Sequence, residues 1–594
     1  MFDYRRTHNC GDLNINQIGE DVVLSGWVHR RRDLGSLVFI DLRDRFGLTQ
    51  IVFDPQTHPH LEEIVHKLRL EWVISIKGKV SPRAQGMSNP KLSTGEIEVR
   101  IEQIQVLSNA KTPPFLIEDQ SDVNEELRLK YRYLDLRSRR LSRNMVIRHQ
   151  VMMIVRKYMD QNGFLEITTP ILAKSTPEGA RDYLVPSRVY PGNFFALPQS
   201  PQIFKQLLMM GGMDRYFQIA TCFRDEDLRA DRQPEFTQID IEMSFSYPED
   251  LMSLVETLIK TIFVSVWGIN DDFHFPRLPY KECIEKYGTD RPDLRFEMPL
   301  IRLDDLFTDT TFETFAQVLQ NKGCIKALCI KNAEGISRKE IEKLTAFVNQ
   351  FGLKGLSWFR KNHEGWSSNL LKFVTPSLLE DIGKRMNALD GDLILVAADT
   401  DGKVNQALDH LRRHVAKQQN LLDPNKLSFL WVTEFPMFKF NEEENKLESE
   451  HHPFTSPHFE DLHLMKTEPL KMRAQAYDLV LNGYEIGGGS QRIHQGDLQK
   501  AIFETLSLTQ DEIQEKFGFF VDALNFGTPP HLGLALGLDR LIMILTKTEN
   551  IRDVIAFPKT QKASDLMLEA PSEVKVQQLQ ELEIASKSQK ITWR

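Results

Sequence analysis

The chain has 594 residues but only five cysteines, and none of them forms a Cys-x-x-Cys pair. This scarcity excludes a disulfide framework and a paired-cysteine zinc or redox site. No stretch approaches the roughly 18–20 apolar residues that a membrane span requires, and the start, Met-Phe-Asp-Tyr, lacks the apolar core of a signal peptide. We therefore expect a cytoplasmic protein with reduced thiols and no membrane association.

Two common nucleotide-binding signatures are also missing. The sequence has no Gly-x-x-x-x-Gly-Lys-Ser/Thr loop and no Gly-x-Gly-x-x-Gly after a predicted strand, which argues against Walker-type and Rossmann-type sites. A formal net charge of −9 excludes a uniformly basic nucleic-acid binder, although a local basic face stays open. The length predicts three or four globular domains.

Residues 1–110 read as an OB-type barrel, because five short β runs surround one helical segment. Alternation in the second run predicts that Val38, Ile40 and Leu42 face the core and that Phe39 points outward. Beside His29–Arg32, Phe39 could stack a nucleic-acid base, or it could be a rim phenylalanine next to a basic turn. The predicted strands are Val22–Val28, Leu37–Leu42, Leu48–Phe53, Trp72–Val80 and Glu96–Leu107, and the helix is His60–Arg69.

The rest of the chain divides by composition and periodicity. Residues 111–135, with Pro113-Pro114, predict a linker or hinge. Apolar residues recur at helical spacing from Ile147 to Tyr158, Gly163 follows as a stop, and Phe164–Leu172 continues as a strand interrupted by Thr169-Pro170. We expect these elements to begin a catalytic domain of residues 136–286 and 425–560. Residues 287–424 interrupt it as an α/β insertion, and 561–594 form a C-terminal extension. In the insertion we predict strands at Ile325–Lys331, Leu356–Arg360 and Asp392–Ala397, and helices at Arg338–Gln350, Ser377–Asn387 and Val404–Lys417.

Three separated segments carry the chemical signal. They are Gly163-Phe-Leu-Glu-Ile-Thr-Thr-Pro170, the pair Cys222-Phe-Arg-Asp-Glu-Asp227 and Arg232-Gln-Pro-Glu-Phe-Thr-Gln-Ile-Asp240, and Gly533-Leu-Ala-Leu-Gly-Leu-Asp-Arg540. In this order they resemble motifs 1, 2 and 3 of the class II aminoacyl-tRNA synthetases. The absence of His-x-Gly-His and Lys-Met-Ser-Lys-Ser segments argues against the other synthetase class.

The resemblance implies an ATP site in which cations let a carboxylate attack the α-phosphorus. Arg224 would bridge the substrate carboxylate and the α-phosphate, and Arg540 would cover the adenine and reach the γ-phosphate. Salt bridges of these arginines to Glu226 or Asp539 are the structural alternative. Asp478 and Glu485 would hold Mg²⁺, although two surface carboxylates are the default interpretation without the resemblance. The ATP-binding residues implied are Arg224, Asp225, Glu226, Gln233, Phe236, Glu485, Gly537, Leu538, Asp539 and Arg540.

The segment Tyr484-Glu-Ile-Gly-Gly-Gly-Ser-Gln-Arg492 resembles the subclass that handles aspartate, asparagine and lysine. Taken singly, Arg492, Lys205 and the pair His451-His452 would be ordinary surface residues, but if they converge they favour a carboxylate substrate. The mobile loop Ser175–Asp182 would close over it. The aspartate-binding residues implied are Glu178, Ser200, Gln202, Lys205, Arg224, Asp240, His451, His452 and Arg492.

Over essentially its whole length the chain resembles the bacterial-type aspartyl-tRNA synthetases. The resemblance implies a multidomain α+β fold, with an OB barrel, a class II antiparallel-sheet catalytic domain and an insertion like the GAD domain of that family. It implies attachment of L-aspartate to tRNA-Asp through an aspartyl adenylate by a homodimer. Leu34 favours restriction to tRNA-Asp, with relaxed charging of tRNA-Asn left open. The anticodon contacts implied are Arg30, Arg32, Phe39 and Gln50.

Two other functions compete with this hypothesis. An adenylating amide ligase would use the same pocket with ammonia, but residues 1–110 argue against it because such relatives lack an anticodon domain. A nucleic-acid-binding protein on an inactive synthetase scaffold is the second alternative. The intact Arg224, Glu485, Arg492 and Arg540 argue against that.

Overall fold

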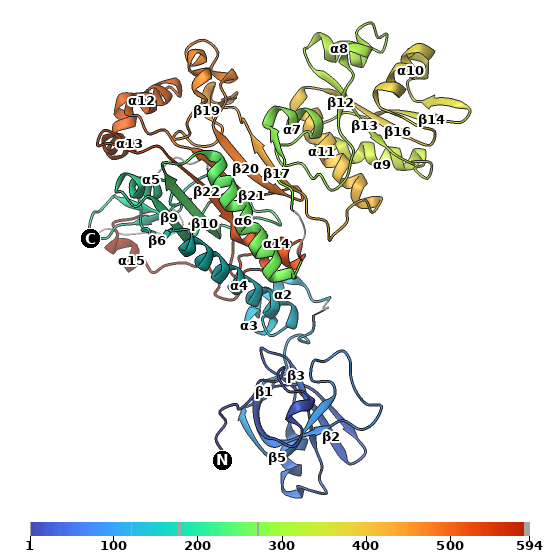
Figure 1. Ribbon diagram of the computed structural model, residues 1–594, viewed down its shortest axis with the longest axis vertical. Helices are drawn as coiled ribbons and strands as arrows, with labels where there is room; N and C mark the ends of the chain where they lie inside the picture. The colour runs from blue at the N-terminus through green and yellow to red at the C-terminus, as the bar shows by residue number, and fades with distance from the viewer. Residues whose placement is uncertain (1, 120–121, 176–179, 270–272, 587–594) are drawn as a thin grey trace. The chain divides into compact units, whose positions relative to one another are not determined.

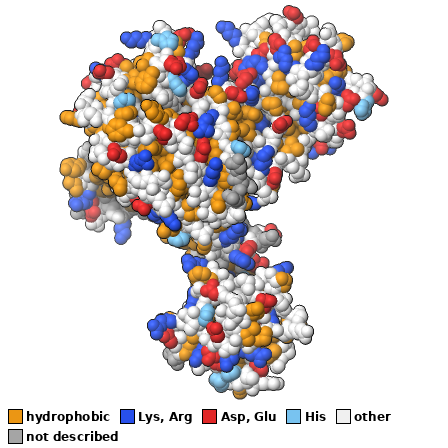
Figure 2. Space-filling view, in the orientation of Figure 1, with side chains coloured by type: hydrophobic (Ala, Val, Ile, Leu, Met, Phe, Trp, Pro, Cys, Tyr) orange, Lys and Arg blue, Asp and Glu red, His pale blue; other side chains and the backbone are white. Residues whose placement is uncertain are grey.

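The computed structural model describes residues 2–119, 122–175, 180–269 and 273–586. The chain forms two compact units, one of Met1–Val146 with Arg552–Ser572 and one of Ile147–Ile551 with Glu573–Arg594 (Figure 1). The expected boundaries at residues 110 and 135 both fall inside the first unit. Within the described ranges, no helix is both long and apolar enough to cross a membrane. On the face shown in Figure 2, cationic and anionic side chains are interspersed, in keeping with the small net charge.

The first unit begins with a closed five-stranded barrel in the order β1-β2-β3-β5-β4. Val38, Ile40 and Leu42 are buried in its core and Phe39 is only half-buried, as the alternation predicted. The predicted OB fold is confirmed. The elements are η1 (Ile15–Gln17), β1 (Asp21–Leu34), β2 (Leu37–Arg43), β3 (Leu48–Phe53), η2 (Pro59–Leu61), α1 (Glu62–Lys67), β4 (Val73–Pro82) and β5 (Ile97–Ser108).

Beyond the barrel, short helices α2 (Glu125–Lys130) and α3 (Arg132–Asp135) lead into α4 (Arg139–Gln161). The buried guanidinium of Arg132 donates to the carbonyls of Arg552, Ile555 and Ala556 at 2.5–2.9 Å, near η7 (Ile551–Asp553). These bonds explain why a segment near the end of the chain belongs to the first unit.

The second unit is built on an eight-stranded sheet in the order β11-β17-β20-β21-β22-β10-β9-β6. Its central pairs are antiparallel, and only the edge pairs β11–β17 and β6–β9 are parallel. The strands are β6 (Leu165–Glu166), β9 (Arg215–Phe223), β10 (Glu235–Ser244), β11 (Arg277–Pro279), β17 (Phe429–Thr433), β20 (Ala476–Leu481), β21 (Tyr484–Gln491) and β22 (His531–Gly537).

Helices pack along this sheet (Figure 1). Tyr158 of α4 donates its hydroxyl to the carbonyl of Leu254 in the neighbouring helix α6, at 3.0 Å. Gly163 follows α4 with a positive φ of 77°, which confirms the predicted stop. The remaining elements of the unit are α5 (Gln202–Met210), α6 (Pro248–Trp267), α7 (Tyr280–Tyr287), α12 (Gly496–Thr505), α13 (Gln510–Leu524), α14 (Leu538–Thr546), α15 (Val576–Glu581), β7 (Leu184–Pro186), β8 (Phe194–Ala196), β18 (Phe438–Asn441), β19 (Lys446–Ser449), η5 (Phe459–Leu464) and η6 (Pro469–Lys471).

The strand predicted over Phe164–Leu172 is shorter than expected, although the predicted interruption at Thr169-Pro170 is present. Only Leu165–Glu166 joins the sheet. The backbone N–H of Thr169 instead donates to the side-chain oxygen of Gln218 at 3.2 Å, and Pro170 has no N–H for a strand ladder. The segment after β6 is therefore irregular.

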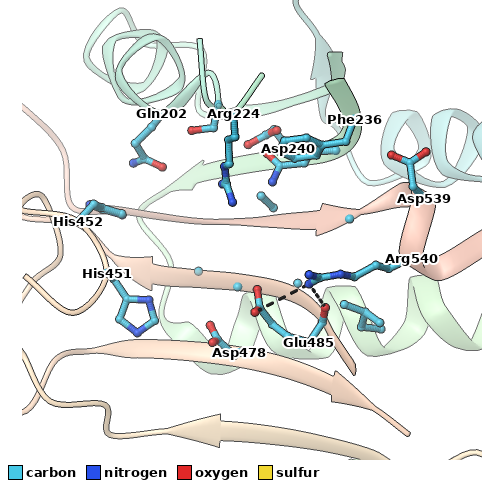
Figure 3. A pocket seen from close by; sticks show the side chains of 18 of the residues that line it. Gln202, Arg224, Phe236, Asp240, His451, His452, Asp478, Glu485, Asp539 and Arg540 are labelled. Atoms are coloured by element: carbon cyan, nitrogen blue, oxygen red, sulfur yellow. Dashed lines mark hydrogen bonds and ion pairs between the residues drawn. The ribbon is translucent and has the colours of Figure 1, made fainter. Parts of the chain in front are cut away.

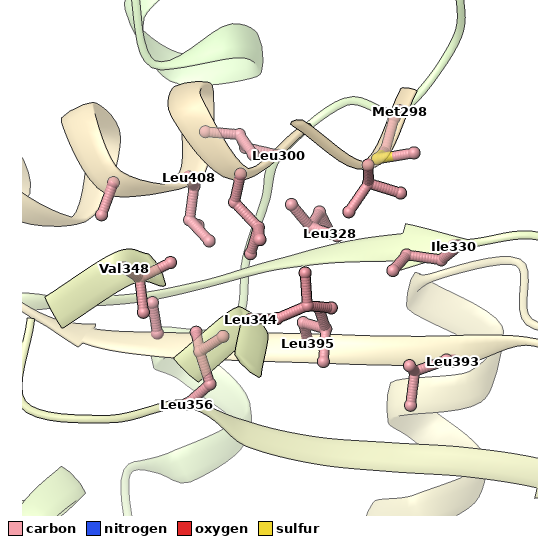
Figure 4. Packing of buried hydrophobic residues seen from close by; sticks show 14 of the residues in the cluster. Met298, Leu300, Leu328, Ile330, Leu344, Val348, Leu356, Leu393, Leu395 and Leu408 are labelled. Atoms are coloured by element: carbon pink, nitrogen blue, oxygen red, sulfur yellow. The ribbon is translucent and has the colours of Figure 1, made fainter. Parts of the chain in front are cut away.

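The insertion has a five-stranded sheet in the order β12-β13-β16-β14-β15, with hydrophobic clusters on both faces. Figure 4 shows one cluster, where Leu328, Ile330, Leu393 and Leu395 of two adjacent strands pack against residues such as Leu408. Every strand pair is antiparallel, so the α/β alternation does not build a parallel sheet. The elements are β12 (Ile301–Arg302), η3 (Asp304–Phe307), α8 (Glu313–Gln320), β13 (Cys324–Ile330), α9 (Arg338–Asn349), β14 (Ser357–Asn362), β15 (Gly365–Ser368), η4 (Leu371–Phe373), α10 (Pro376–Arg385), β16 (Leu393–Asp399) and α11 (Asp401–Gln418).

Candidate functional site

A cavity of about 410 Å³ opens over the centre of the eight-stranded sheet. Figure 3 shows Gln202, Arg224 and Asp240 on one side of it and Asp478 and Glu485 on the other. Most of the predicted site residues line this cavity: Ser200, Gln202, Lys205, Arg224, Glu226, Gln233, Phe236, Asp240, His451, His452, Asp478, Glu485, Arg492, Gly537, Asp539 and Arg540.

Three predicted residues are not among those that line the cavity. Asp225 instead pairs with Arg181, whose Nε lies 3.6 Å from a carboxylate oxygen of Asp225. The Leu538 side chain is fully buried at the start of α14, because a helix that packs on the sheet needs an apolar residue there. Glu178 lies outside the described residues.

Lys205 and Arg492 meet in the same cavity, as the hypothesis of a carboxylate substrate requires. The Nζ of Lys205 lies 3.0 Å from Oδ1 of Asp240 and 3.5 Å from Oε2 of Glu242. Arg492 donates to both carboxylate oxygens of Glu242, at 2.9 and 3.2 Å. All four side chains are almost completely buried, so two cations and two anions neutralise each other away from water.

The pKa directions follow from this burial and pairing. Burial raises the pKa of Asp240 despite the opposing effect of Lys205. Burial acts in the same sense on Glu242, but Arg492 and Lys205 outweigh it and hold the pKa of Glu242 below its usual value. Within the described residues, Oδ2 of Asp240 and Nε2 of Gln202 are buried without a hydrogen-bond partner. They offer a substrate one acceptor and one donor.

The two histidines are neutral components of the cavity wall. Burial lowers the pKa of His451 to about 4, and burial together with the Arg492 charge lowers the pKa of His452 well below its usual value. Nε2 of His452 lies 2.8 Å from Nη1 of Arg492. These histidines therefore supply hydrogen-bonding atoms rather than charge.

An arginine and an aromatic ring that line the same cavity lie together. The guanidinium of Arg224 stands 5.1 Å from the ring centre of Phe236, within cation–π range. Arg540 donates to the backbone carbonyl of Glu485 at 2.8 Å and lies 3.3 Å from a carboxylate oxygen of Asp231. A planar base could lie between such groups, with its phosphates near the cations.

Asp539 holds the neighbouring strand β10 in place beside the cavity. Its carboxylate accepts from the Thr237 backbone N–H at 2.8 Å and pairs with Arg148 of α4. Arg148 also donates to the Thr237 hydroxyl at 2.8 Å. The salt bridge between Arg540 and Asp539, considered as the structural alternative, is absent from the described contacts, and Asp539 is engaged by Thr237 and Arg148 instead. Glu226, in contrast, forms a salt bridge with Arg232 at 2.8 Å.

Asp478 and Glu485 lie on the two strands of a hairpin. Asn482 and Gly483 join the two strands with positive φ values of 53° and 81°, which suit a tight hairpin turn. Burial and the nearby Glu485, Asp290 and Glu450 raise the pKa of Asp478 well above its usual value. A Cβ on Gly488 would approach Asp478 Oδ1 to 2.6 Å, so this strand needs glycine there.

These carboxylates fit Mg²⁺ chemically, because hard oxygen ligands whose charges repel each other gain from a divalent cation. Among the described residues no group of three or more His, Cys, Asp or Glu side chains is close enough to hold a metal ion alone. A cation there would need phosphate or water oxygens as further ligands.

Sequence reasoning missed several residues that line the cavity or contact its charged side chains. Glu242 continues the alternation of Gln238 and Asp240 along β10, with Ile239 and Ile241 on the opposite face, and this pattern of period two could have found it. Asp290 had no such signal, because it lies inside the predicted insertion 287–424. At least one residue of the range predicted as the insertion therefore belongs to the site. The missed lining residues include Asp231, Gln238, Asp290, Glu450 and Ser490.

The predicted anticodon residues share the outer face of three barrel strands. Phe39 pairs with Val52 and Arg32, and Asp41 pairs with Arg30 and Gln50, so alternate residues place all of them on one side. Gln50 is buried, accepts from Arg32 at 3.2 Å and donates to Glu98 at 3.0 Å. Its contact with a base stays a prediction and would require these bonds to rearrange.

The chain matches two family models and is similar over its whole length to known bacterial proteins. Residues 124–561 match the family model described as tRNA synthetases class II (D, K and N), and residues 22–107 match the OB-fold nucleic acid binding domain. An aspartate–tRNA(Asp/Asn) ligase of Protochlamydia amoebophila is 61% identical over 100% of this chain and 99% of its own length. One from Chlamydia caviae is 54% identical over 98% and 99%, respectively.

Solved structures agree on the fold. Asparaginyl-tRNA synthetase of Pyrococcus horikoshii, complexed with asparaginyl-adenylate, superposes with a TM-score of 0.58 and 19% identity over 93% of this chain and 98% of that one. A putative aspartyl-tRNA synthetase of Leishmania major gives a TM-score of 0.59 with 18% identity over 94% of each chain. The family-model match and the full-length identity together establish that the chain belongs to the class II tRNA synthetases of the D, K and N group, in the family of the aspartate–tRNA ligases.

Proposed function

We propose that the protein attaches L-aspartate to tRNA-Asp in two steps at the cavity over the sheet. The observation that carries this proposal is the convergence of Lys205 and Arg492 beside Asp240, in a cavity that Arg224, Phe236 and Arg540 also line. A side-chain carboxylate fits the cations, and the α-ammonium fits the unpaired oxygen of Asp240.

In the first step an oxygen of the aspartate α-carboxylate attacks the α-phosphorus of ATP. The new P–O bond forms as the bond to the β-phosphate oxygen breaks, which gives aspartyl adenylate and pyrophosphate. Two anions must approach, so the reaction depends on cations placed beforehand. Arg224 would neutralise both at the point of attack, while Phe236 and Arg540 hold the adenine between them.

Asp478 and Glu485 would hold Mg²⁺ on the ATP phosphates, where the ion supplies charge neutralisation for the triphosphate and the leaving pyrophosphate. The raised pKa of Asp478 supports this, since the free carboxylates repel one another. Arg540, which lies 4.0 Å from a carboxylate oxygen of Glu485, adds a fixed cation on the same side.

In the second step a hydroxyl of the terminal tRNA ribose attacks the aspartyl carbonyl and releases AMP. The barrel face with Arg30, Arg32 and Phe39 would bind the anticodon. Similar proteins with 54–61% identity are named for both tRNA-Asp and tRNA-Asn. We therefore propose that this protein charges both, against the expectation from Leu34, which is an exposed residue at the end of β1.

Location and assembly are part of the proposal. We propose that the protein works in the cytoplasm, because an enzyme that charges tRNA supplies the ribosomes there. Leu165 of motif 1 and the residues Ile171 and Leu172 that directly follow it are each about half exposed, and such apolar exposure fits an interface in a homodimer.

The test is aspartate-dependent exchange of pyrophosphate into ATP, followed by charging of purified tRNA-Asp and tRNA-Asn. We expect exchange with aspartate but not with asparagine or lysine, and charging of both tRNAs. Exchange that prefers asparagine would refute the substrate, and charging of tRNA-Asp alone would refute dual specificity while leaving the first step intact.

A further inference from the structure

Glu242 is a buried carboxylate that the proposed reaction does not use. It lies on β10, two residues beyond Asp240, and is 0% exposed. Both of its oxygens accept from Arg492, and Oε2 also lies 3.5 Å from Lys205. One carboxylate therefore contacts both of the cations proposed to bind the aspartate side chain.

The backbone opposite Glu242 leaves room for its carboxylate. Glu242 faces Gly533 of β22 in the antiparallel register. A Cβ on Gly533 would lie 1.7 Å from Oε2 of Glu242, a distance that no side chain tolerates. The glycine of motif 3 and the glutamate that follows motif 2 are thus sterically matched across the sheet.

We propose that Glu242 is a positioning residue that sets the specificity of the cavity for aspartate, an inference that rests on the proposed function. It orients the guanidinium of Arg492 and fixes the distance between that guanidinium and Lys205. The guanidinium has five N–H donors, of which Nε and Nη2 point at Glu242. The donors on the remaining edge are thereby aimed at Ser490, His452 and the substrate carboxylate.

Removing the negative charge of Glu242 could change aspartate binding in either of two opposite directions, depending on the role of Glu242. If Glu242 only competed with the substrate for the two cations, its neutralisation would strengthen aspartate binding. If Glu242 orients them, the loss of its charge releases the guanidinium, and aspartate binding weakens although the cavity has become more positive.

The experiment uses two variants of the full-length protein. Glu242→Gln keeps the shape and removes the charge, whereas Glu242→Asp keeps the charge and withdraws it by one methylene. We expect both to raise the KM for aspartate in pyrophosphate exchange by about 10- to 100-fold, and to leave the KM for ATP within about twofold. Glu249→Gln is the matched control, because Glu249 forms an exposed ion pair with Arg277 and does not line the cavity. It should change neither constant.

Glu242→Gln removes one member of a buried ion pair and could fail to fold, so thermal melting accompanies each assay. Glu242→Asp, which retains the pair, then carries the test. An unchanged or lower KM for aspartate in a folded variant would overturn the inference, as would an equal rise in both KM values.

Calorimetric titration of aspartate into the wild-type protein separates the two proposals. If the wild type binds aspartate without exchange activity, the proposed reaction is wrong, and the affinities of the two variants still test Glu242. If the wild type does not bind aspartate at all, both proposals are overturned.

Discussion

The guanidinium of Arg492 is almost completely shielded from bulk water and is held on one side by Glu242. Replacing it with an apolar residue would leave the buried Glu242 with only the more distant Lys205 as a cationic partner, and removal of one partner of a buried ion pair typically costs about 3–5 kcal/mol. A conservative replacement therefore tests its role more cleanly than leucine would.

We predict that Arg492→Lys raises the KM for aspartate by about 100-fold while ATP binding is retained, because an ammonium cannot grip two carboxylates with a planar fork. Pyrophosphate exchange at varied aspartate and varied ATP measures both constants. An aspartate KM like that of the wild type would refute the assigned role of Arg492.

A second prediction concerns the buried carboxyl group of Asp478. Since burial and neighbouring carboxylates disfavour its charged form, Asp478→Asn should raise the melting temperature of the ligand-free protein by a few degrees. The same change should weaken ATP-dependent exchange and raise the Mg²⁺ concentration required. Glu468→Gln, at an exposed ion pair with Lys471, is the control. A lower melting temperature with full activity would contradict the expectation.

Most of the predicted residues that line the cavity belong to local sequence patterns: motifs 2 and 3 and the segments around Lys205, His451 and Tyr484–Arg492. Glu242 and Asp290 lie outside these patterns: alternation along β10 could have pointed to Glu242 but not to its partner, and Asp290 carries no signal in the sequence. Glu242 faces Gly533, which is 291 positions away along the chain and becomes its neighbour only through the β10–β22 pairing.

At the scale of elements, alternation predicted the barrel well because β2 and β3 each bury one face completely. The strand predicted after Gly163 is shorter than expected, because a side chain from a strand distant in sequence, Gln218, accepts from the backbone of Thr169. The predicted ends of the long helices α9 and α11 in the insertion agree with the observed ends to within three residues, because each helix buries a continuous apolar stripe.

The outer face of β2 provides a functional prediction. Phe39→Ala should reduce aminoacylation of tRNA but leave aspartate-dependent pyrophosphate exchange unchanged, because base stacking contributes about 1–3 kcal/mol and is remote from the adenylate chemistry. Val38 is buried in the core, so Val38→Ala serves as a comparison that affects stability instead. Equal loss in both assays for Phe39→Ala would remove its anticodon role.

Helix α7 and the sheet of the insertion are joined by charged groups around Glu285. Its carboxylate accepts from Arg302 at 3.0 Å and from the fully buried Lys326 at 2.8 Å, and chiefly the Arg302 bond lowers the pKa of Glu285 to about 2. A carboxylate with a lowered pKa stabilises the fold above its unfolded pKa, here near 4.5, and loses that contribution as the pH falls towards 2.

Glu285→Gln should therefore lower the urea midpoint at pH 7, and the difference from the wild type should shrink as the pH falls from about 4.5 towards 2. Denaturation followed by circular dichroism at several pH values measures it. A difference that stays constant over this range would show that the charge of Glu285 is not what stabilises the junction.

At the scale of the whole molecule, apolar side chains around motif 1 remain exposed on the surface of the described chain. We predict sedimentation as a dimer of the 68.8 kDa chain and a shift towards monomer for Ile171→Asp, because a charge would be buried at the interface. Analytical ultracentrifugation measures both. Leu389→Asp, at an exposed leucine of the insertion, is the control and should leave the mass unchanged. Monomeric wild type would refute the dimer.

The first unit brings together residues that the chain holds far apart: Arg132 donates to carbonyls at positions 552, 555 and 556. A ribosome makes the barrel early, and that part can fold while the rest is still being synthesised. The guanidinium of Arg132 must wait until more than four hundred further residues have emerged before its acceptors exist. Helix α3 therefore gains these hydrogen bonds only after every strand of the eight-stranded sheet has been synthesised.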